Sequence, residues 1–206
     1  MEIEKDLHNY IRIFENALPE KVLNNFLKVC KDYKSWEKAT IVANSEGLSS
    51  VEEKTRSTNL WCLNNIGNKS FTEVHWCNFF KYIFKNAINE YLDLCNHSSR
   101  RNHFKASSRN HFKVLDIQVL KYTEEGHYVF HIDHGTTTPR TFSCIFFVND
   151  NYEGGDLKFR YPISEEEKII PKKKNTLIVW PSNFLYPHTV TPVKNGERFS
   201  VVSWAL

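Results

Sequence analysis

The stretch His127-Tyr128-Val129-Phe130-His131-Ile132-Asp133 contains the pattern that decides how this chain folds. Successive side chains of an extended strand point to opposite faces, so His131 and Asp133 project together and Ile132 turns into packing. His188 follows later, within the segment Tyr-Pro-His-Thr-Val. Two imidazoles and one carboxylate on one face of an octahedral ion are typical of non-haem Fe(II) centres whose other face stays open. The pattern therefore predicts an iron site made by His131, Asp133 and His188.

A His-x-Asp pair alone is a weak signal, and the motifs around it strengthen the prediction. They fall in a fixed order along residues 120–122, 126–128, 152–157, 187–193 and 196–200, together with Arg140 and Trp204. This ordered set resembles the prolyl 4-hydroxylase-like branch of the 2-oxoglutarate/Fe(II) oxygenase superfamily. The resemblance covers roughly the C-terminal half of the chain.

The resemblance implies a mainly β fold with flanking helices. Its core would be a double-stranded β-helix, or jelly roll, with N-terminal helices packed on the major sheet. A chain of 206 residues is long enough for one domain with a sizeable core. We expect residues 1–206 to form a single dioxygenase domain, in which 1–113 are a support region with a substrate-side loop and 114–206 are the catalytic core.

Hydrophobic periodicity locates the expected elements. Spacing by three and four predicts helices at about 19–33, with Pro19 in the first turn, and at 71–95. Short alternating or apolar runs predict strands at 9–14, 114–122, 128–133, 141–149, 157–161, 176–180, 188–193 and 198–204. Residues 36–63 have a mixed pattern, and the glycines within 152–156 predict a hairpin turn.

A tandem near-duplication, SSRRNHFK at 98–105 and SSRNHFK at 107–113, is the most unusual feature of the sequence. One pair of copies is too few for a solenoid. We interpret it as a basic loop lengthened by one copy, because loop closure tolerates extra residues cheaply. An anion-binding or substrate-gripping lid is the alternative.

The resemblance also implies how the co-substrate would be held. Arg198 would bind the far carboxylate of 2-oxoglutarate, because a planar guanidinium offers two parallel donors to a carboxylate. Tyr122 and Ser200 would add hydroxyl groups. The hypoxia-sensing prolyl hydroxylases of this family carry a co-substrate-binding tyrosine where this chain has Phe147, so another hydroxyl or water must compensate. The implied cofactors are Fe(II) and 2-oxoglutarate, with ascorbate as a candidate reductant.

By the same resemblance, the substrate-facing candidates are Tyr128, Arg140, Trp204 and Arg56. Each has a structural alternative: Tyr128 as a barrel filler, Arg140 as a loop charge, Trp204 as an apolar strand end and Arg56 as a solvated surface arginine. An aromatic ring and an arginine beside iron suit an extended peptide with an exposed proline. The favoured function is therefore hydroxylation of a prolyl residue in a protein or peptide. The same chemistry on a small molecule, such as a free amino acid or metabolite, and a catalytically silent jelly-roll binding module stay open.

Composition narrows the setting in which the protein is expected to act. The 27 Lys and Arg against 24 Asp and Glu leave a net charge of only +3, which favours neither nucleic acid nor membrane as a partner. No apolar leader or membrane span is recognisable, and the cysteines lack CxxC spacing. We expect reduced thiols and a cytoplasmic location, with the oligomeric state left open. The cysteines are Cys30, Cys62, Cys77, Cys95 and Cys144.

Overall fold

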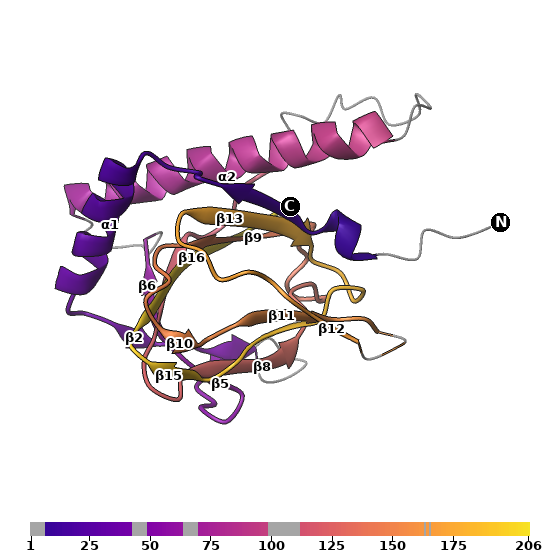
Figure 1. Ribbon diagram of the computed structural model, residues 1–206. Coiled ribbons are helices and arrows are strands. Elements are labelled where there is room, and N and C mark those ends of the chain that lie inside the picture. The colour runs from indigo at the N-terminus through magenta and orange to yellow at the C-terminus, as the bar shows by residue number, and fades with distance from the viewer. Residues whose placement is uncertain (1–6, 43–48, 64–69, 99–111, 163, 165) are drawn as a thin grey trace.

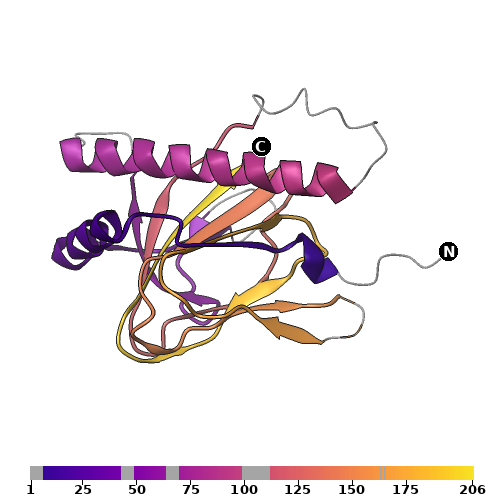
Figure 2. The same ribbon diagram turned by 45° about the horizontal axis from the view of Figure 1, so that its top comes forward.

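The computed structural model describes residues 7–42, 49–63, 70–98, 112–162, 164 and 166–206. Two antiparallel sheets face one another, and two helices cover the outer face of the larger sheet (Figure 1). Figure 2 shows the longer helix lying across that sheet, with the smaller sheet on the far side. This architecture is a double-stranded β-helix, so the predicted fold class is confirmed.

The major sheet has seven strands, and the N-terminal half of the chain supplies three of them. Their spatial order is β1 (Arg12–Glu15), β13 (Thr176–Pro181), β9 (Phe142–Phe147), β16 (Arg198–Ala205), β7 (Gln118–Tyr122), β6 (Asn59–Cys62) and β2 (Glu37–Lys38). The division of the chain into a support region and a catalytic core stays a prediction.

The minor sheet has five strands and carries both candidate histidine ligands. Its order is β12 (Glu167–Ile169), β11 (Leu157–Arg160), β14 (His188–Val190), β8 (His127–His131) and β5 (Arg56–Ser57). Two further strand pairs flank the sheets: β10 (Glu153–Gly154) with β15 (Val193–Asn195), and β3 (Ile41–Val42) with β4 (Ser49–Ser50).

Strand β9 is buried on both faces, because the helices cover one face and the barrel interior the other. All six of its residues are buried. Phe142, Cys144 and Phe146 pack toward the helices, whereas Ile145 and Phe147 belong to the interior cluster of the barrel. A strand covered on both faces is a continuous apolar run in the sequence, which is why the apolar pattern locates this segment correctly.

The helices are α1 (Glu20–Asp32) and α2 (Phe71–Ser98), after a short 3-10 helix at Leu7–Tyr10. Phe26 of α1 lies 4.7 Å from Phe80 of α2 between ring centroids, and Phe80 lies 5.8 Å from Phe146 of β9. These ring contacts form one continuous apolar layer between the two helices and the major sheet. Both helices agree with their predictions, except that Pro19 precedes the first helical turn. None of the helices in the described ranges is long and apolar enough to span a bilayer.

Several strand predictions are corrected in detail. Residues 9–14 begin as 3-10 helix, and residues 188–193 end their strand at Val190, before Pro192. The glycine segment 152–156 is not a hairpin turn, since β9 and β11 lie in different sheets and Glu153–Gly154 pairs with β15. Short strands at 37–38, 41–42, 49–50, 56–57, 59–62 and 167–169 have too few residues to show a period.

The metal-bearing strand is also shorter than predicted. Strand β8 ends at His131, so Asp133 lies beyond it in the following loop. Ile132 is 43% exposed and is not turned into packing, because the chain leaves the sheet at this point. The tandem duplication lies almost wholly outside the described residues.

Asn175 joins the N-terminal segment to the start of β13. Its backbone φ is +61°, a left-handed value that asparagine tolerates better than most residues. Its side-chain oxygen accepts a hydrogen bond from Leu18 N at 2.8 Å, and its amide donates to Leu18 O at 2.7 Å. One buried side chain therefore satisfies both backbone groups of Leu18.

We predict that Asn175→Ala lowers the free energy of unfolding by about 2–4 kcal/mol, from two lost buried hydrogen bonds and a strained φ. Asn175→Gly removes the same bonds but relieves the φ, so it should lose about 1 kcal/mol less. Urea unfolding measures both. Equal stability of wild type and Asn175→Ala would show that Leu18 is satisfied in another way.

Candidate metal centre

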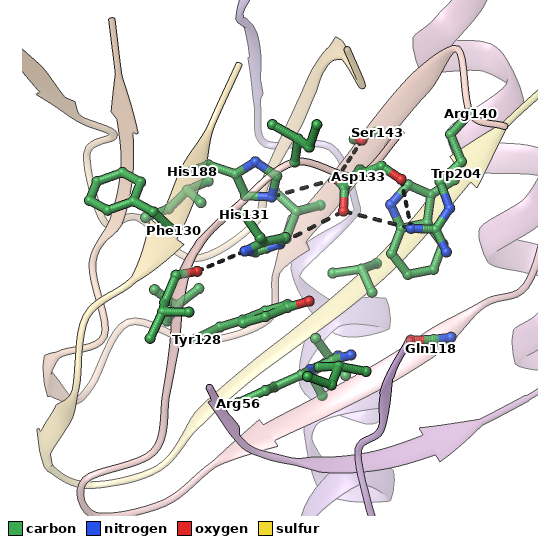
Figure 3. Close-up of a pocket in the computed structure, with 18 of the residues that line it drawn as sticks. Arg56, Gln118, Tyr128, Phe130, His131, Asp133, Arg140, Ser143, His188 and Trp204 are labelled. Carbon is green, nitrogen blue, oxygen red and sulfur yellow. Dashed lines mark hydrogen bonds and ion pairs between the residues drawn. The ribbon is translucent and has the colours of Figure 1, made fainter. Parts of the chain in front are cut away.

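Three predicted ligands converge although they come from separate segments of the chain. His131 ends β8, Asp133 follows two residues later, and His188 begins β14, where it pairs directly with His131. His131 Nε2 lies 3.8 Å from Asp133 Oδ1, and His188 Nε2 lies 3.5 Å from Asp133 Oδ2. One possible ligand atom from each residue lies within 4.8 Å of the others. Figure 3 shows the three side chains next to one another.

Backbone carbonyl groups fix the orientation of both imidazole rings. His131 Nδ1 lies 2.9 Å from Val129 O, and His188 Nδ1 lies 3.0 Å from Tyr186 O. A carbonyl oxygen can only accept, so each Nδ1 carries the proton and each Nε2 keeps its lone pair. Both lone pairs are therefore available for a metal ion, in the arrangement common to metal-binding histidines.

A chain of hydroxyl groups holds the carboxylate of Asp133. Ser143 Oγ donates to Asp133 Oδ2 at 2.6 Å and lies 2.7 Å from Ser182 Oγ. Since Ser143 has one proton and the carboxylate takes it, Ser182 must donate to Ser143. Ser143 belongs to β9 and Ser182 follows β13, so the carboxylate is tied to the major sheet.

The protonation of the three residues suits a divalent cation. Burial, with the neighbouring His188, lowers the pKa of His131 to about 3, so this imidazole is neutral near pH 7. Burial opposes ionisation of Asp133, but the two histidines, the Ser143 hydroxyl and Arg140 together hold its pKa below the ordinary range. Two imidazoles and one carboxylate form a donor set that fits Fe(II) and leaves coordination positions open.

A cavity of about 470 Å³ lies against these ligands and reaches Leu120 and Tyr122. All four substrate-facing candidates line it: Arg56, Tyr128, Arg140 and Trp204. Arg56 is half-buried and lines this cavity, so its role as a substrate-facing residue stays a prediction.

Tyr128 reaches the metal ligands because strand β8 bulges. His131 pairs with His188, but Val190 pairs with Tyr128, so the register shifts between the two pairs. The bulge brings Tyr128 and His131 to the same side, where their rings stack at 3.6 Å with 16° between planes. Arg56 lies on the neighbouring strand β5, and its guanidinium lies 4.8 Å from the centre of the Tyr128 ring. Tyr128 thus contacts a metal ligand as well as the cavity.

Arg198 is the second unusual feature of the interior. Its side chain is fully buried, and Nη1 donates to Ser200 Oγ at 3.0 Å. Among the described residues, none accepts a hydrogen bond from its Nε or Nη2. Its guanidinium lies 4.9 Å from the ring of Tyr122, which lines the cavity, and 5.4 Å from the ring of Phe147.

A buried guanidinium with two unused donors is costly unless an anion accepts them. The predicted group, a carboxylate of 2-oxoglutarate, matches those donors in charge and geometry. Phe147 presents only an aromatic ring here. The hydroxyl of Ser200 accepts a hydrogen bond from Arg198, Tyr152 also interacts with the guanidinium, and the ring of Tyr122 lies beside it. Arg198 itself does not line the cavity, and Tyr122 stands beside it at the cavity wall.

Gly155 makes room for the stem of Arg198. A Cβ atom at this position would lie 3.0 Å from Arg198 Cδ and 3.0 Å from Tyr152 Cε2, and the φ of Gly155 is +60°. Both the space and the backbone conformation require glycine.

Sequence reasoning missed three residues of the site: Ser143, Ser182 and Trp180. Ser143 and Trp180 line the cavity, and Ser143 contacts Asp133. Ser143 had a signal, since it is the single hydroxyl-bearing residue within the apolar run 142–147 and shares the parity of Ile145 and Phe147. No spacing marked the others.

Comparison with known proteins agrees with this geometry. Residues 117–206 match the family model of the 2OG-Fe(II) oxygenase superfamily. A PKHD-type hydroxylase of Synechococcus is 29% identical over 96 residues, which cover 45% of this chain and 42% of that protein. One of Rippkaea orientalis is 30% identical over 99 residues, covering 45% and 43%. The matched part thus spans less than half the length of these curated relatives.

Solved structures show the same fold over nearly the whole chain. A Pseudomonas putida prolyl-4-hydroxylase covers 95% of this chain and 91% of its own, with a TM-score of 0.63 and 18% identity. A Trichoplax adhaerens prolyl hydroxylase, in complex with a hypoxia inducible factor peptide fragment, covers 96% and 84%, with a TM-score of 0.68 and 16% identity. Residues 117–206 are therefore similar to the 2OG-Fe(II) oxygenase superfamily, and the fold is similar to that of the prolyl-4-hydroxylase.

We predict that Ser143→Ala weakens Fe(II) binding about 10- to 100-fold, because outer hydrogen bonds to a ligand set its orientation and basicity. Anaerobic competition with a coloured chelator measures the affinity. His131→Ala should abolish Fe(II) binding, so this variant sets the lower limit of the measured affinity.

Ser203→Ala is the matched control, since Ser203 is buried on β16 and its hydroxyl faces only the carbonyl of Trp204 at 3.4 Å. Its Fe(II) affinity should equal that of wild type. Equal affinity of Ser143→Ala and wild type would mean that Asp133 needs no hydroxyl support.

Proposed function

We propose that this protein is a 2-oxoglutarate-dependent Fe(II) dioxygenase that hydroxylates a C–H bond, and that this bond belongs to a prolyl residue in a protein or peptide. The observation that carries the proposal is the combination of the His131–Asp133–His188 set with the unpaired buried guanidinium of Arg198. One offers a divalent ion three ligands, and the other offers an anion two free donors. A catalytically silent binding module would not need both a metal site and an anion site.

In this proposal, His131 Nε2, His188 Nε2 and a carboxylate oxygen of Asp133 hold the Fe(II). Bound iron and 2-oxoglutarate supply the oxidising chemistry, as cofactors do in general. The protein orients the ligands through Val129 O, Tyr186 O and the Ser143 hydroxyl. Ascorbate as a reductant stays a prediction.

Arg198 and Ser200 would hold the far carboxylate of 2-oxoglutarate, with Tyr122 beside them. The Nε and Nη2 donors of Arg198 are the free pair that a bidentate carboxylate requires. Burial strengthens such a pair, because little water competes for the donors.

A peptide substrate is supported by the cavity and by one structural neighbour. The residues that line the cavity include two arginines and two aromatic residues named as substrate-facing candidates: Arg56, Arg140, Tyr128 and Trp204. The Trichoplax adhaerens neighbour has a similar fold and is in complex with a peptide fragment. An extended proline-containing segment would reach the metal ligands between these side chains.

Two assays test the proposed function. Protein loaded with Fe(II) should form succinate from 2-oxoglutarate in air, and mass spectrometry of proline-containing peptides should find one added oxygen. Absence of succinate with stoichiometric iron bound would overturn the dioxygenase. Succinate formation with oxygen added to other substrates only would overturn the prolyl specificity.

We predict that Arg198→Met raises the 2-oxoglutarate concentration needed for half-maximal succinate formation about 100-fold or more, because a bidentate charged contact is lost. Without 2-oxoglutarate, the variant should unfold at the wild-type temperature or higher, since an unpaired buried charge has been removed. The increase in melting temperature that 2-oxoglutarate gives wild type should disappear.

Arg12→Met is a matched control, because Arg12 also has a buried, unpaired Nε but lies on the edge strand β1. It should keep the wild-type 2-oxoglutarate requirement. An unchanged requirement in Arg198→Met would remove Arg198 from the co-substrate site.

A further inference from the structure

Two arginine side chains from separate segments line one cavity. Arg56 comes from β5 and Arg140 from the loop before β9; Figure 3 shows Arg56 next to Tyr128 and Arg140 next to Trp204 and Asp133. Both guanidinium groups therefore belong to the lining of one cavity.

Backbone carbonyl groups and aromatic rings hold the two arginines, and the carboxylate near Arg140 is that of Asp133. Arg56 Nη1 donates to Thr40 O at 3.1 Å, and its buried Nε has no hydrogen-bond partner among the described residues. Arg140 Nη1 donates to Asp133 O at 3.2 Å, and its guanidinium lies 3.7 Å from the Trp204 ring. These contacts position the groups without neutralising them.

Asp133 is the one carboxylate-bearing residue among the described residues that line the cavity. Its Oδ1 lies 3.7 Å from Arg140 Nη1, yet the same carboxylate is a proposed ligand of Fe(II). The exposed Asp116 contributes least among the charged neighbours of Arg140. In the loaded site, the charges of Fe(II), Asp133, 2-oxoglutarate and Arg198 cancel, which leaves two positive charges next to the reacting carbon.

We propose that the substrate carries a carboxylate close to the carbon that is hydroxylated, and that Arg56 and Arg140 bind this carboxylate. This inference rests on the proposed function and narrows its substrate class. The free Nε of Arg56 offers a donor, and Arg140 contacts the backbone of a metal ligand, so the anion binds within about one side chain's length of the iron. Tyr128 lines the same cavity; burial raises the pKa of its hydroxyl, and the charges of Arg56 and Arg140 oppose that rise.

Three sources could supply such a carboxylate: an acidic residue beside a proline, a C-terminal proline, or a free amino acid. The test uses matched pairs that differ only in this charge. They are short peptides with Pro-Asp or Pro-Asn, peptides ending in proline as the acid or the amide, and L-proline or L-prolinamide. Calorimetry measures their binding to protein loaded with Mn(II) and 2-oxoglutarate under anaerobic conditions, where no turnover occurs.

The acid member of at least one pair should bind about 10- to 100-fold more tightly than its neutral partner, as expected for a partly buried charged hydrogen bond. The pair that shows the preference identifies the source of the carboxylate. In Arg56→Gln the preference should fall about tenfold or more, whereas Arg12→Gln should keep it. Arg56→Lys keeps the charge without the planar fork and should retain part of it.

The absence of a charge preference in all three pairs, whether or not they bind, would overturn the inference, as would an unchanged preference in Arg56→Gln. Failure of the proposed function is distinguishable, because it would appear as the absence of succinate from Fe(II)-loaded protein given 2-oxoglutarate alone. Succinate formed without any charge preference would leave the dioxygenase standing and remove only the anionic substrate.

Discussion

The site depends on the antiparallel pairing of β8 with β14, which sets His131 directly opposite His188. The two histidines are 57 positions apart in the sequence, so only this register brings their rings to 4.2 Å. A shift by one residue would turn one histidine to the outer face of the sheet. The bulge in the same pair then adds Tyr128 to the inner face, so one local irregularity supplies both the ligand geometry and a wall of the cavity.

The major sheet contributes the polar residues that surround these histidines. Its strands β9 and β16 carry Ser143 and Arg198 inward, while their alternate residues pack against α1 and α2. Because helices cover the outer face, these strands are rigid supports for buried polar groups. Ser143 holds a metal ligand in place, and Arg198 provides a charge that is unpaired within the described protein.

The sequence predicts the double-stranded β-helix, both long helices and the three metal ligands, because each rests on a pattern that the chain itself displays. Continuous apolar strands such as β9 and long helical periods such as that of α2 are strong local signals. The two-residue strands lack such signals, since their pairing depends on partners distant in the chain. The sequence therefore favours a surface position for Arg56, because nothing near this residue shows that β5 pairs with β8.

The same limit explains the hydroxyl chain and the bulge. Ser182 follows β13, and it becomes relevant only because β13 pairs with β9 beside Ser143. Strict alternation up to Asp133 predicts that Ile132 packs inside, whereas β8 ends two residues before Asp133. Register and strand ends are properties of the sheet as a whole, and they decide which side chains meet.

Both histidines belong to the minor sheet, whereas hydrogen bonds attach the carboxylate of Asp133 to the major sheet. An ion bound by all three residues would therefore link the two sheets of the barrel. Its release would remove this link as well as the reactive centre, so binding of the ion and the folding stability of the barrel would be thermodynamically coupled.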